Sequence, residues 1–177
     1  YYANLDNYYK QHFLGLIHTL ALSDNQSLKT DLRYFNTDSS GANSAGTSGY
    51  RMSGYTKNGD GEIDNRTWSA FFTYSLEGHA LSAGYQQVSG DSNFMQLNQT
   101  SIPGQGGATT YLITDRQITN FARAGERTWI TQYGYDFGKI GVPGLTANVL
   151  YMKGDNIKSA DGDLKEWERD LTVSYVL

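Results

Sequence analysis

NRTWSAFFTYSL, residues 65–76, alternates apolar and polar side chains, as do ERTWITQYGYDF at 126–137 and LKEWERDLTVSYVL at 164–177. Each segment has a Trp near its start, and most residues of the same parity as this Trp are apolar or aromatic. The residues between them are mostly small or polar. A period of two, with aromatic residues at both ends of the apolar face, is typical of transmembrane β-strands whose other face borders water.

The composition agrees with such strands. The 177 residues include 14 Tyr and 20 Gly but only 2 Pro and no Cys. No apolar run approaches the 18 or so residues that a membrane-spanning helix needs. A net charge of −4 without a basic cluster argues against a nucleic-acid partner, and the absence of Cys excludes thiolate ligands and disulfides. We predict no cofactor and no metal site.

Breaks in the alternation divide the chain into eight predicted strands. Short connections at 24–27, 77–78 and 141–144 alternate with long ones at 39–64 and 92–126. This asymmetry is typical of an antiparallel up-and-down transmembrane β-barrel with tight periplasmic turns and long outer loops. The predicted strands are 1–5, 8–22, 28–38, 65–76, 79–91, 127–138, 145–155 and 165–177.

Both ends of the sequence already read as strands. We therefore expect residues 1–177 to be an internal part of a single outer-membrane β-barrel domain.

The predicted orientation places three aromatic residues at one membrane interface. Trp68, Trp129 and Trp167 each begin a strand that runs from the long-loop end toward the short-turn end. Aromatic girdles mark the rims of the apolar band in such barrels. The three Trp residues are therefore predicted to lie at the outer lipid interface.

Basic residues share the outward parity of these Trp residues. Arg66, Arg127 and Arg169 are suited to bidentate bonds with the phosphates of lipopolysaccharide, because a long basic side chain reaches from the band edge to the headgroups. The alternative is that they are only solvated rim charges.

Charges of the opposite parity are predicted to line the pore. Lys29, Asp31 and Arg33 alternate on one predicted strand, and a charge facing lipid near the midplane costs about 2–4 kcal/mol. Either the two cations attract anionic solutes, or Asp31 neutralises them in a structural network. With two cations and four acids, the predicted lumen charges do not by themselves predict anion selectivity. The remaining predicted pore-lining residues are Asp136, Glu168 and Asp170.

The long connection 92–126 carries Arg116 and Arg123 among Asn, Gln, Thr and Gly. Loops of this length without periodic structure are usually functional or disordered. We favour a constriction loop that contacts the solute, with Arg123 as the first candidate.

Three stretches resemble the OprD family of outer-membrane porins, the substrate-specific carboxylate channels: YYANLDNYYKQHFLGL (1–16), YDFGKIGVPGLTANVLYMKGDNI (135–157) and EWERDLTVSYV (166–176). The resemblance implies a barrel of about eighteen strands, within the range of porins. By this resemblance the chain would supply about strands nine to sixteen, with the first half of the barrel and its last hairpin missing. It also implies selective diffusion of small carboxylates, such as amino acids or aromatic acids, past an inward loop and a ladder of basic residues. Leu150 and Ser174 stand where relatives often carry basic residues, so part of that ladder is missing.

The sequence thus favours a porin in the outer membrane of a Gram-negative bacterium, with lipid, lipopolysaccharide and small anionic or zwitterionic solutes as partners. A homotrimer and a monomer are both compatible with it. The alternatives are a small, closed eight-stranded barrel with an adhesion or envelope-structural role, and a soluble carbohydrate-binding sandwich. An enzyme is not predicted, because a hydrolase in a barrel wall needs a Ser or Thr with a nearby His and acid, whereas His18 has outward parity and His79 lies at a turn.

Overall fold

The computed structural model describes residues 1–96 and 112–176. Residues 97–111 of the predicted long loop, and Leu177 at the end of the last predicted strand, lie outside this part of the chain. Among the described residues, no helix is long and apolar enough to cross a membrane.

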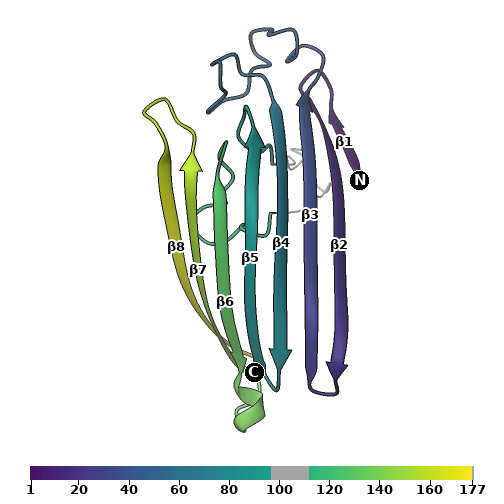
Figure 1. The fold of residues 1–177 in the computed structure, drawn as a ribbon, viewed down its shortest axis with the longest axis vertical. Coiled ribbons are helices and arrows are strands. Elements are labelled where there is room, and N and C mark those ends of the chain that lie inside the picture. Colours follow the sequence, from purple (N-terminus) through teal and green to yellow (C-terminus); the bar gives the residue numbers. More distant parts are fainter. Residues whose placement is uncertain (97–111, 177) are drawn as a thin grey trace.

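The chain forms an eight-stranded antiparallel sheet in which every strand pairs with the next one along the sequence (Figure 1). This confirms the predicted all-β, up-and-down architecture. The strand boundaries differ from the predicted ones by at most two residues. In one place the secondary structure itself changes: residues 137–138, predicted to end a strand, begin the short 3-10 helix η1, Phe137–Ile140. The strands are β1 Tyr2–Leu5, β2 Tyr9–Ser23, β3 Gln26–Ser39, β4 Asp64–Leu76, β5 His79–Gly90, β6 Arg127–Asp136, β7 Leu145–Ile157 and β8 Leu164–Tyr175.

The two faces of the sheet differ in what covers them. Residues 112–126, which precede β6, fold back onto one face, here called the loop face. The opposite face, called the open face, carries exposed apolar residues such as Leu32, Leu81 and Leu171. Alternation along each strand assigns successive side chains to the two faces, so the period of two in the sequence separates them.

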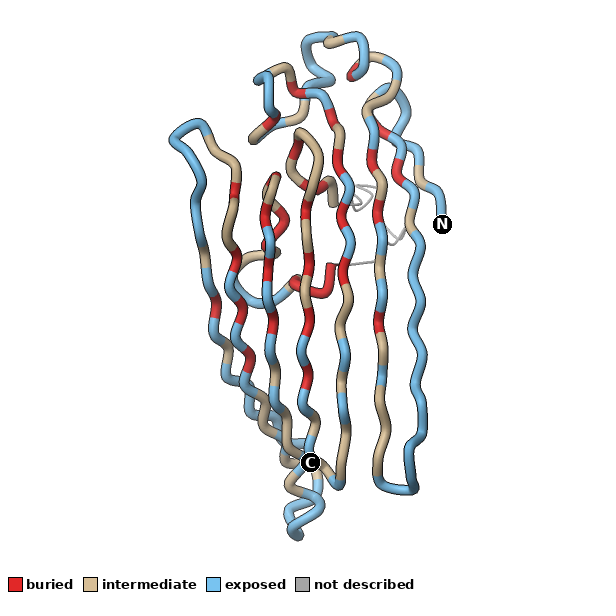
Figure 2. The backbone as a smooth tube through the Cα atoms, in the orientation of Figure 1, coloured by how far each residue is buried: buried red, intermediate tan, exposed pale blue. Residues whose placement is uncertain are grey.

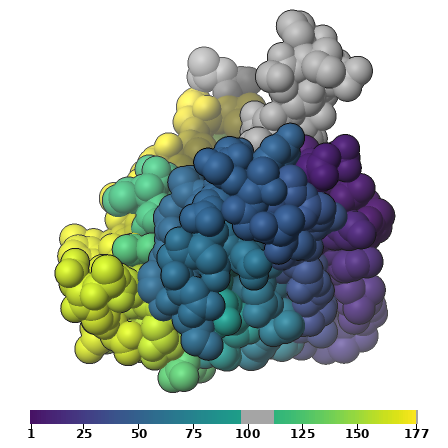
Figure 3. Space-filling view, turned by 90° about the horizontal axis from the view of Figure 1, so that it is seen from above, coloured from purple at the N-terminus to yellow at the C-terminus, as the bar shows by residue number. Residues whose placement is uncertain are grey.

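Short turns join the strands at one end (Figure 1). The long connections β3–β4 and β5–β6 leave the sheet at the other end, where β1 and β2 are joined by residues 6–8. At the short-turn end, Glu77 and Gly78 have φ values of 46° and 92°, the left-handed pair that a tight hairpin requires. At the other end, the connection between β3 and β4 forms the blue surface in front when the molecule is viewed from above (Figure 3).

Two buried clusters hold residues 112–126 on the loop face. Leu112 and Ala122 pack with Phe35, Val88 and Phe94, while a second cluster lies over β6 and β7. Figure 2 shows that buried residues are concentrated in the half of the sheet nearer the long connections. The second cluster consists of Ile113, Phe121, Ile130, Leu150 and Met152, with Phe71 packed against it.

Candidate functional site

The tip of the inward-folded segment is fixed by one buried carboxylate on β8. Glu168 is 1% exposed, and its Oε1 accepts the backbone N–H groups of Gln117 and Ile118 at 3.0 Å each. Its Oε2 accepts the N–H of Thr119 at 3.1 Å. A carboxylate that accepts three backbone N–H bonds is well satisfied without a cation. Glu168 was predicted to line the pore, and the structure shows that its charge is used to hold the loop.

A buried amide on β5 supports the same segment from the other side. Gln86 Nε2 donates to Thr114 Oγ1 at 2.8 Å and to the carbonyl of Phe121 at 3.0 Å. The Thr114 hydroxyl in turn donates to the carbonyl of Asn120 at 2.7 Å. Ile118, at the tip, is 77% exposed. The segment is therefore held to both β5 and β8, and the Ile118 side chain at its tip remains exposed.

The base of the segment contains a pair of acids and one cation. Glu126 is fully buried, and its Oε2 accepts the backbone N–H of Arg123 at 3.0 Å. Burial, with a further contribution from the neighbouring Glu166, raises the pKa of Glu126 to about 8. The Arg123 guanidinium forms an ion pair with Glu166 of β8. Arg123, the first candidate for a solute contact, thus has a structural partner at the base of the loop.

A cavity of about 370 Å³ lies between β3, β4 and the segment. Arg33 forms a bidentate ion pair with Asp31, with N···O distances of 2.8 and 2.7 Å, as in the predicted neutralising network. Lys29 is exposed, and no described residue forms an ion pair with it. The cavity is lined by Lys29, Asp31, Arg33, Phe71, Thr73, Leu112, Ile113, Asp115 and Arg116.

The loop side of this cavity is formed by Asp115 and Arg116. The Asp115 carboxylate accepts the N–H of Leu112 at 3.1 Å, and burial raises its pKa above the usual range. Arg116 is an exposed residue, and its Nη1 donates to the backbone carbonyl of Asp115 at 2.8 Å. The structure therefore brings Arg116 into the same cavity as Lys29, although the two residues are far apart in sequence.

The remaining acids predicted to line the pore have different surroundings. Asp136 is the N-cap of η1, and its Oδ1 accepts the N–H of Gly138 at 2.9 Å. This places it at the short-turn end in a local capping role. Asp170 lies on the loop face of β8, two residues from Glu168, and is half-buried.

The three Trp residues lie on the open face. Trp129, Lys153 and Trp167 form one row across β6, β7 and β8, whereas Trp68 lies one row nearer the long connections, level with Gln87 of β5. The half-buried Tyr85 packs between two of them, with its ring centroid 5.4 Å from that of Trp68 and 4.8 Å from that of Trp129. The geometry fits a common aromatic belt.

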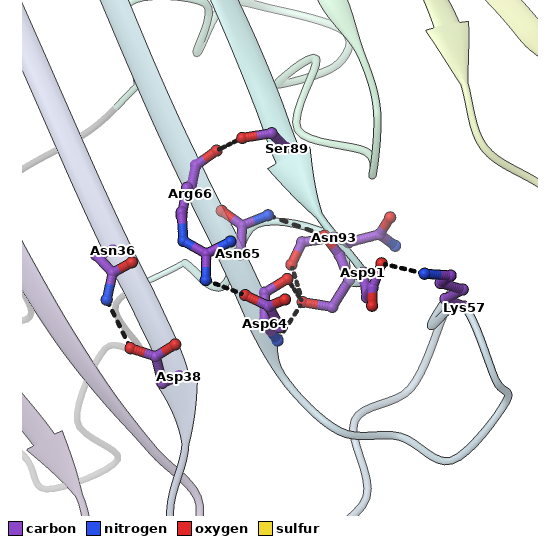
Figure 4. A network of polar contacts seen from close by, with 10 residues as sticks. Asn36, Asp38, Lys57, Asp64, Asn65, Arg66, Ser89, Asp91 and Asn93 are labelled. Carbon is purple, nitrogen blue, oxygen red and sulfur yellow. Dashed lines mark hydrogen bonds and ion pairs between the residues drawn. The ribbon is translucent and has the colours of Figure 1, made fainter.

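The outward arginines differ in their partners. Arg66 forms an ion pair with Asp64 at 3.2 Å within the polar network that joins β4, β5 and the neighbouring loops (Figure 4). Arg127 is exposed on the open face of β6, opposite Asp155 of β7. Arg169 lies one row nearer the short turns than Trp167, opposite Tyr151.

The sequence analysis missed the buried residues that hold the segment. Gln86, Glu126 and Phe121 are fully buried, and Phe121 has a φ of 49°. The apolar Ile113 and Phe121 in an otherwise polar stretch were the available signal, because apolar residues inside a long loop indicate that it packs against something.

The sequence profile of the family described as "outer membrane porin, OprD family" matches residues 1–177. Porin D of Pseudomonas aeruginosa is 30% identical over 192 aligned residues, which cover all of this chain and 40% of that protein. The porin-like protein GalP of Pseudomonas putida is also 30% identical, over all of this chain and 37% of its own length. The chain thus spans about two fifths of the length of these relatives.

Solved structures from Pseudomonas aeruginosa have the same fold. OccK8 (OprE) superimposes with a TM-score of 0.87 at 53% identity, over 99% of this chain and 44% of that chain. OpdQ superimposes with a TM-score of 0.80 at 41% identity, over 99% of this chain and 41% of that chain.

Proposed function

Because the chain belongs to the OprD family of outer-membrane porins, we propose that it forms part of a water-filled pore for small solutes, chiefly carboxylates. The candidate substrates are amino acids or aromatic acids. The observation that carries this proposal is the cavity between β3 and the inward-folded segment, where Lys29 and Arg116 face one space from two different elements. A carboxylate in this space would be within reach of both cations, and fixed cations in a pore favour anions.

The acids of the loop face weaken this attraction less than their number indicates. Asp31 is neutralised by Arg33, Glu168 is satisfied by three backbone N–H groups, and Asp136 caps η1. The fourth acid predicted to line the pore, Asp170, interacts with Glu168 and with the cation Arg116. Lys29 and Arg116 are therefore the charges best placed to act on a passing solute.

The segment 112–126 narrows the space beside the sheet. It is anchored by Glu168, by Gln86 and by two apolar clusters, so it is a fixed constriction rather than a loose loop. A constriction with placed charges gives selectivity by size and by charge together.

We further propose that the eight strands are part of a larger barrel. Within the described residues, β1 and β8 are the two ends of the sheet, and unpaired strand edges are not tolerated in lipid. The relatives are more than twice as long as this chain, which leaves room for the further strands.

The test uses the intact porin in planar bilayers. Benzoate and benzamide have nearly the same shape but differ in charge, so they separate carboxylate recognition from simple passage. We expect benzoate on the long-loop side to reduce the chloride current through single channels and benzamide at the same concentration to leave it unchanged. Equal effects of the two compounds would contradict carboxylate recognition, and an absence of channels would contradict the porin function itself.

A further inference from the structure

The open face of β4, β5 and β6 carries a groove of about 580 Å³. It lies on the opposite side of the sheet from the cavity that contains Lys29 and Arg116, so it is not part of the proposed solute path. The groove is lined by Trp68, Ala70, Phe72, Ala83, Gly84, Tyr85, Arg127, Trp129 and Asp155.

The groove exists because small outward residues lie between large ones. Ala70 and Ala83 are the small side chains, whereas Trp68 and Phe72 rise on one side and Trp129 on the other. Trp68 is 42% exposed and Trp129 is 64% exposed, so their rings stand out from the sheet as walls. The result is a narrow apolar groove whose floor has no charged group.

The mouth of the groove carries a cation, Arg127. Arg127 lies level with Trp68 and Gln87, at the edge of the groove nearer the long connections. No ion pair involves Arg127 within residues 1–96 and 112–176, in contrast to Arg66. Lys153 lies in the same row as Trp129 and Trp167, one row nearer the short turns. Asp155, opposite Arg127 on β7, is the one acid that lines the groove. Arg127 and Lys153 together outnumber this acid, and cations beside an apolar groove complement an anionic headgroup above a hydrocarbon chain.

We propose that this groove is a binding site for lipopolysaccharide, with an acyl chain of its lipid A between Trp68 and Trp129 and a phosphate on Arg127. The inference rests on the outer-membrane placement in the proposed function. Long loops of such barrels face the outside, so the mouth lies in the outer leaflet, where lipopolysaccharide is the main lipid. Arg forms bidentate, charge-assisted bonds to phosphate, and the apolar groove takes the chain that follows.

Charge distinguishes this occupant from a second copy of the chain. A symmetric contact would bring Arg127 and Lys153 of one copy toward the same two cations of the other, with Asp155 as the one acid lining each groove. Lipid A carries both the negatively charged phosphates and the long apolar acyl chains that this groove requires.

The experiment measures lipid A bound to the intact, delipidated porin by native mass spectrometry. Two variants alter the site: Ala70→Leu with Ala83→Leu fills the floor, and Arg127→Gln removes the phosphate contact. Ala147→Leu is the matched control, because Ala147 lies opposite Tyr135 on the same face but outside the groove. We expect binding of lipid A to weaken about tenfold in Arg127→Gln, the effect of losing a hydrogen bond to a charged group. The filled floor should weaken it similarly, and the control should bind as the wild type does.

Three results would overturn the proposal. Lipid A binding could be the same in all variants, the site could retain phosphatidylglycerol as strongly as lipid A, or the filled floor could abolish a porin dimer instead of a lipid adduct. Single-channel conductance is recorded in parallel, and the groove variants should leave it unchanged. Normal conductance with unaltered lipid A binding would refute this site alone, whereas a wild-type protein without channels would refute the proposed function.

Discussion

Glu168 on β8 accepts the backbone N–H of Ile118 at 3.0 Å across a separation of 50 residues. The bond joins the wall of the sheet to the tip of the segment that folds over it. Because the same carboxylate also binds Gln117 and Thr119, one side chain determines the position of the whole tip.

Replacing Glu168 with Gln should loosen this tip. The amide keeps the size of the side chain but turns an NH₂ group toward backbone donors, and an unsatisfied buried group costs about 1–3 kcal/mol. Hydrogen exchange of the amides of residues 117–119 in the intact porin should accelerate, and the single-channel current should become noisier. Asp161→Asn, which changes an exposed acid in the connection between β7 and β8, is the control and should leave both unchanged. Unaltered exchange in Glu168→Gln would show that the apolar clusters alone hold the tip.

The two cations of β3 should contribute unequally to selectivity. Lys29→Gln removes an exposed charge, whereas Asp31→Asn with Arg33→Gln removes a closed ion pair and leaves the net charge unchanged. In reversal-potential measurements, Lys29→Gln should lower the preference for anions and the double variant should have little effect. The shift should be larger at 0.01 M salt, where the Debye length is about 30 Å, than at 0.15 M, where it is about 8 Å. Equal shifts in the two variants would mean that Arg33 attracts solutes despite its pairing with Asp31.

Local sequence patterns predicted the strands because a half-buried strand repeats every two residues. They placed Trp68, Trp129 and Trp167 on one face for the same reason. Turn chemistry predicted the hairpin at Glu77 and Gly78. None of these signals depends on residues distant in the sequence.

The anchoring of the segment could not be predicted in this way. Glu168 looks like a pore-lining acid when only its parity is considered, and its partners at residues 117–119 are recognised only once the chain is folded. The same holds for Ile130 and Met152, which share the parity of water-facing residues but are fully buried under Phe121 and its neighbours. Parity identifies the face of the sheet, and only tertiary structure shows what covers that face.

Packing at the base of the segment should depend on pH. Glu126 is buried and its pKa is raised to about 8 from about 4.5, while Glu166 and Arg123 are the charged groups that face it. The docked segment therefore binds a proton more tightly than the undocked one does. The stabilisation of the docked segment that comes from the Glu126 proton should be fully present below about pH 4.5. It should be lost as the pH rises toward 8.

Hydrogen-exchange protection of residues 121–126, corrected for intrinsic rates, should accordingly be lower at pH 8.5 than at pH 5. Glu126→Gln mimics the protonated form and should remove most of this dependence. Asp161→Asn, an exposed acid in the connection between β7 and β8, should retain it. A pH dependence that persists in Glu126→Gln would assign it to another group.

The base of the segment also packs closely against Gly154 of β7, where there is no room for a side chain. A Cβ atom added at Gly154 would collide with Oε1 of Glu126 and lie 3.0 Å from Cδ1 of Phe121. Both neighbours are fully buried, so neither can move away easily. Gly154→Ala should therefore displace the segment, at the cost of about 1–3 kcal/mol typical of overpacking.

Gly134→Ala on β6 is the matched control for this change. The nearest atom to its added Cβ would be Nδ2 of Asn148 at 3.4 Å, an ordinary contact. Thermal unfolding of the detergent-solubilised porin, together with limited proteolysis at Arg116 and Arg123, measures the two variants side by side. We expect faster cleavage in Gly154→Ala and wild-type behaviour in Gly134→Ala. If Gly154→Ala were cleaved no faster than the wild type, then Glu126 and Phe121 would have room to move, and close contact with β7 would not be what holds the base of the constriction.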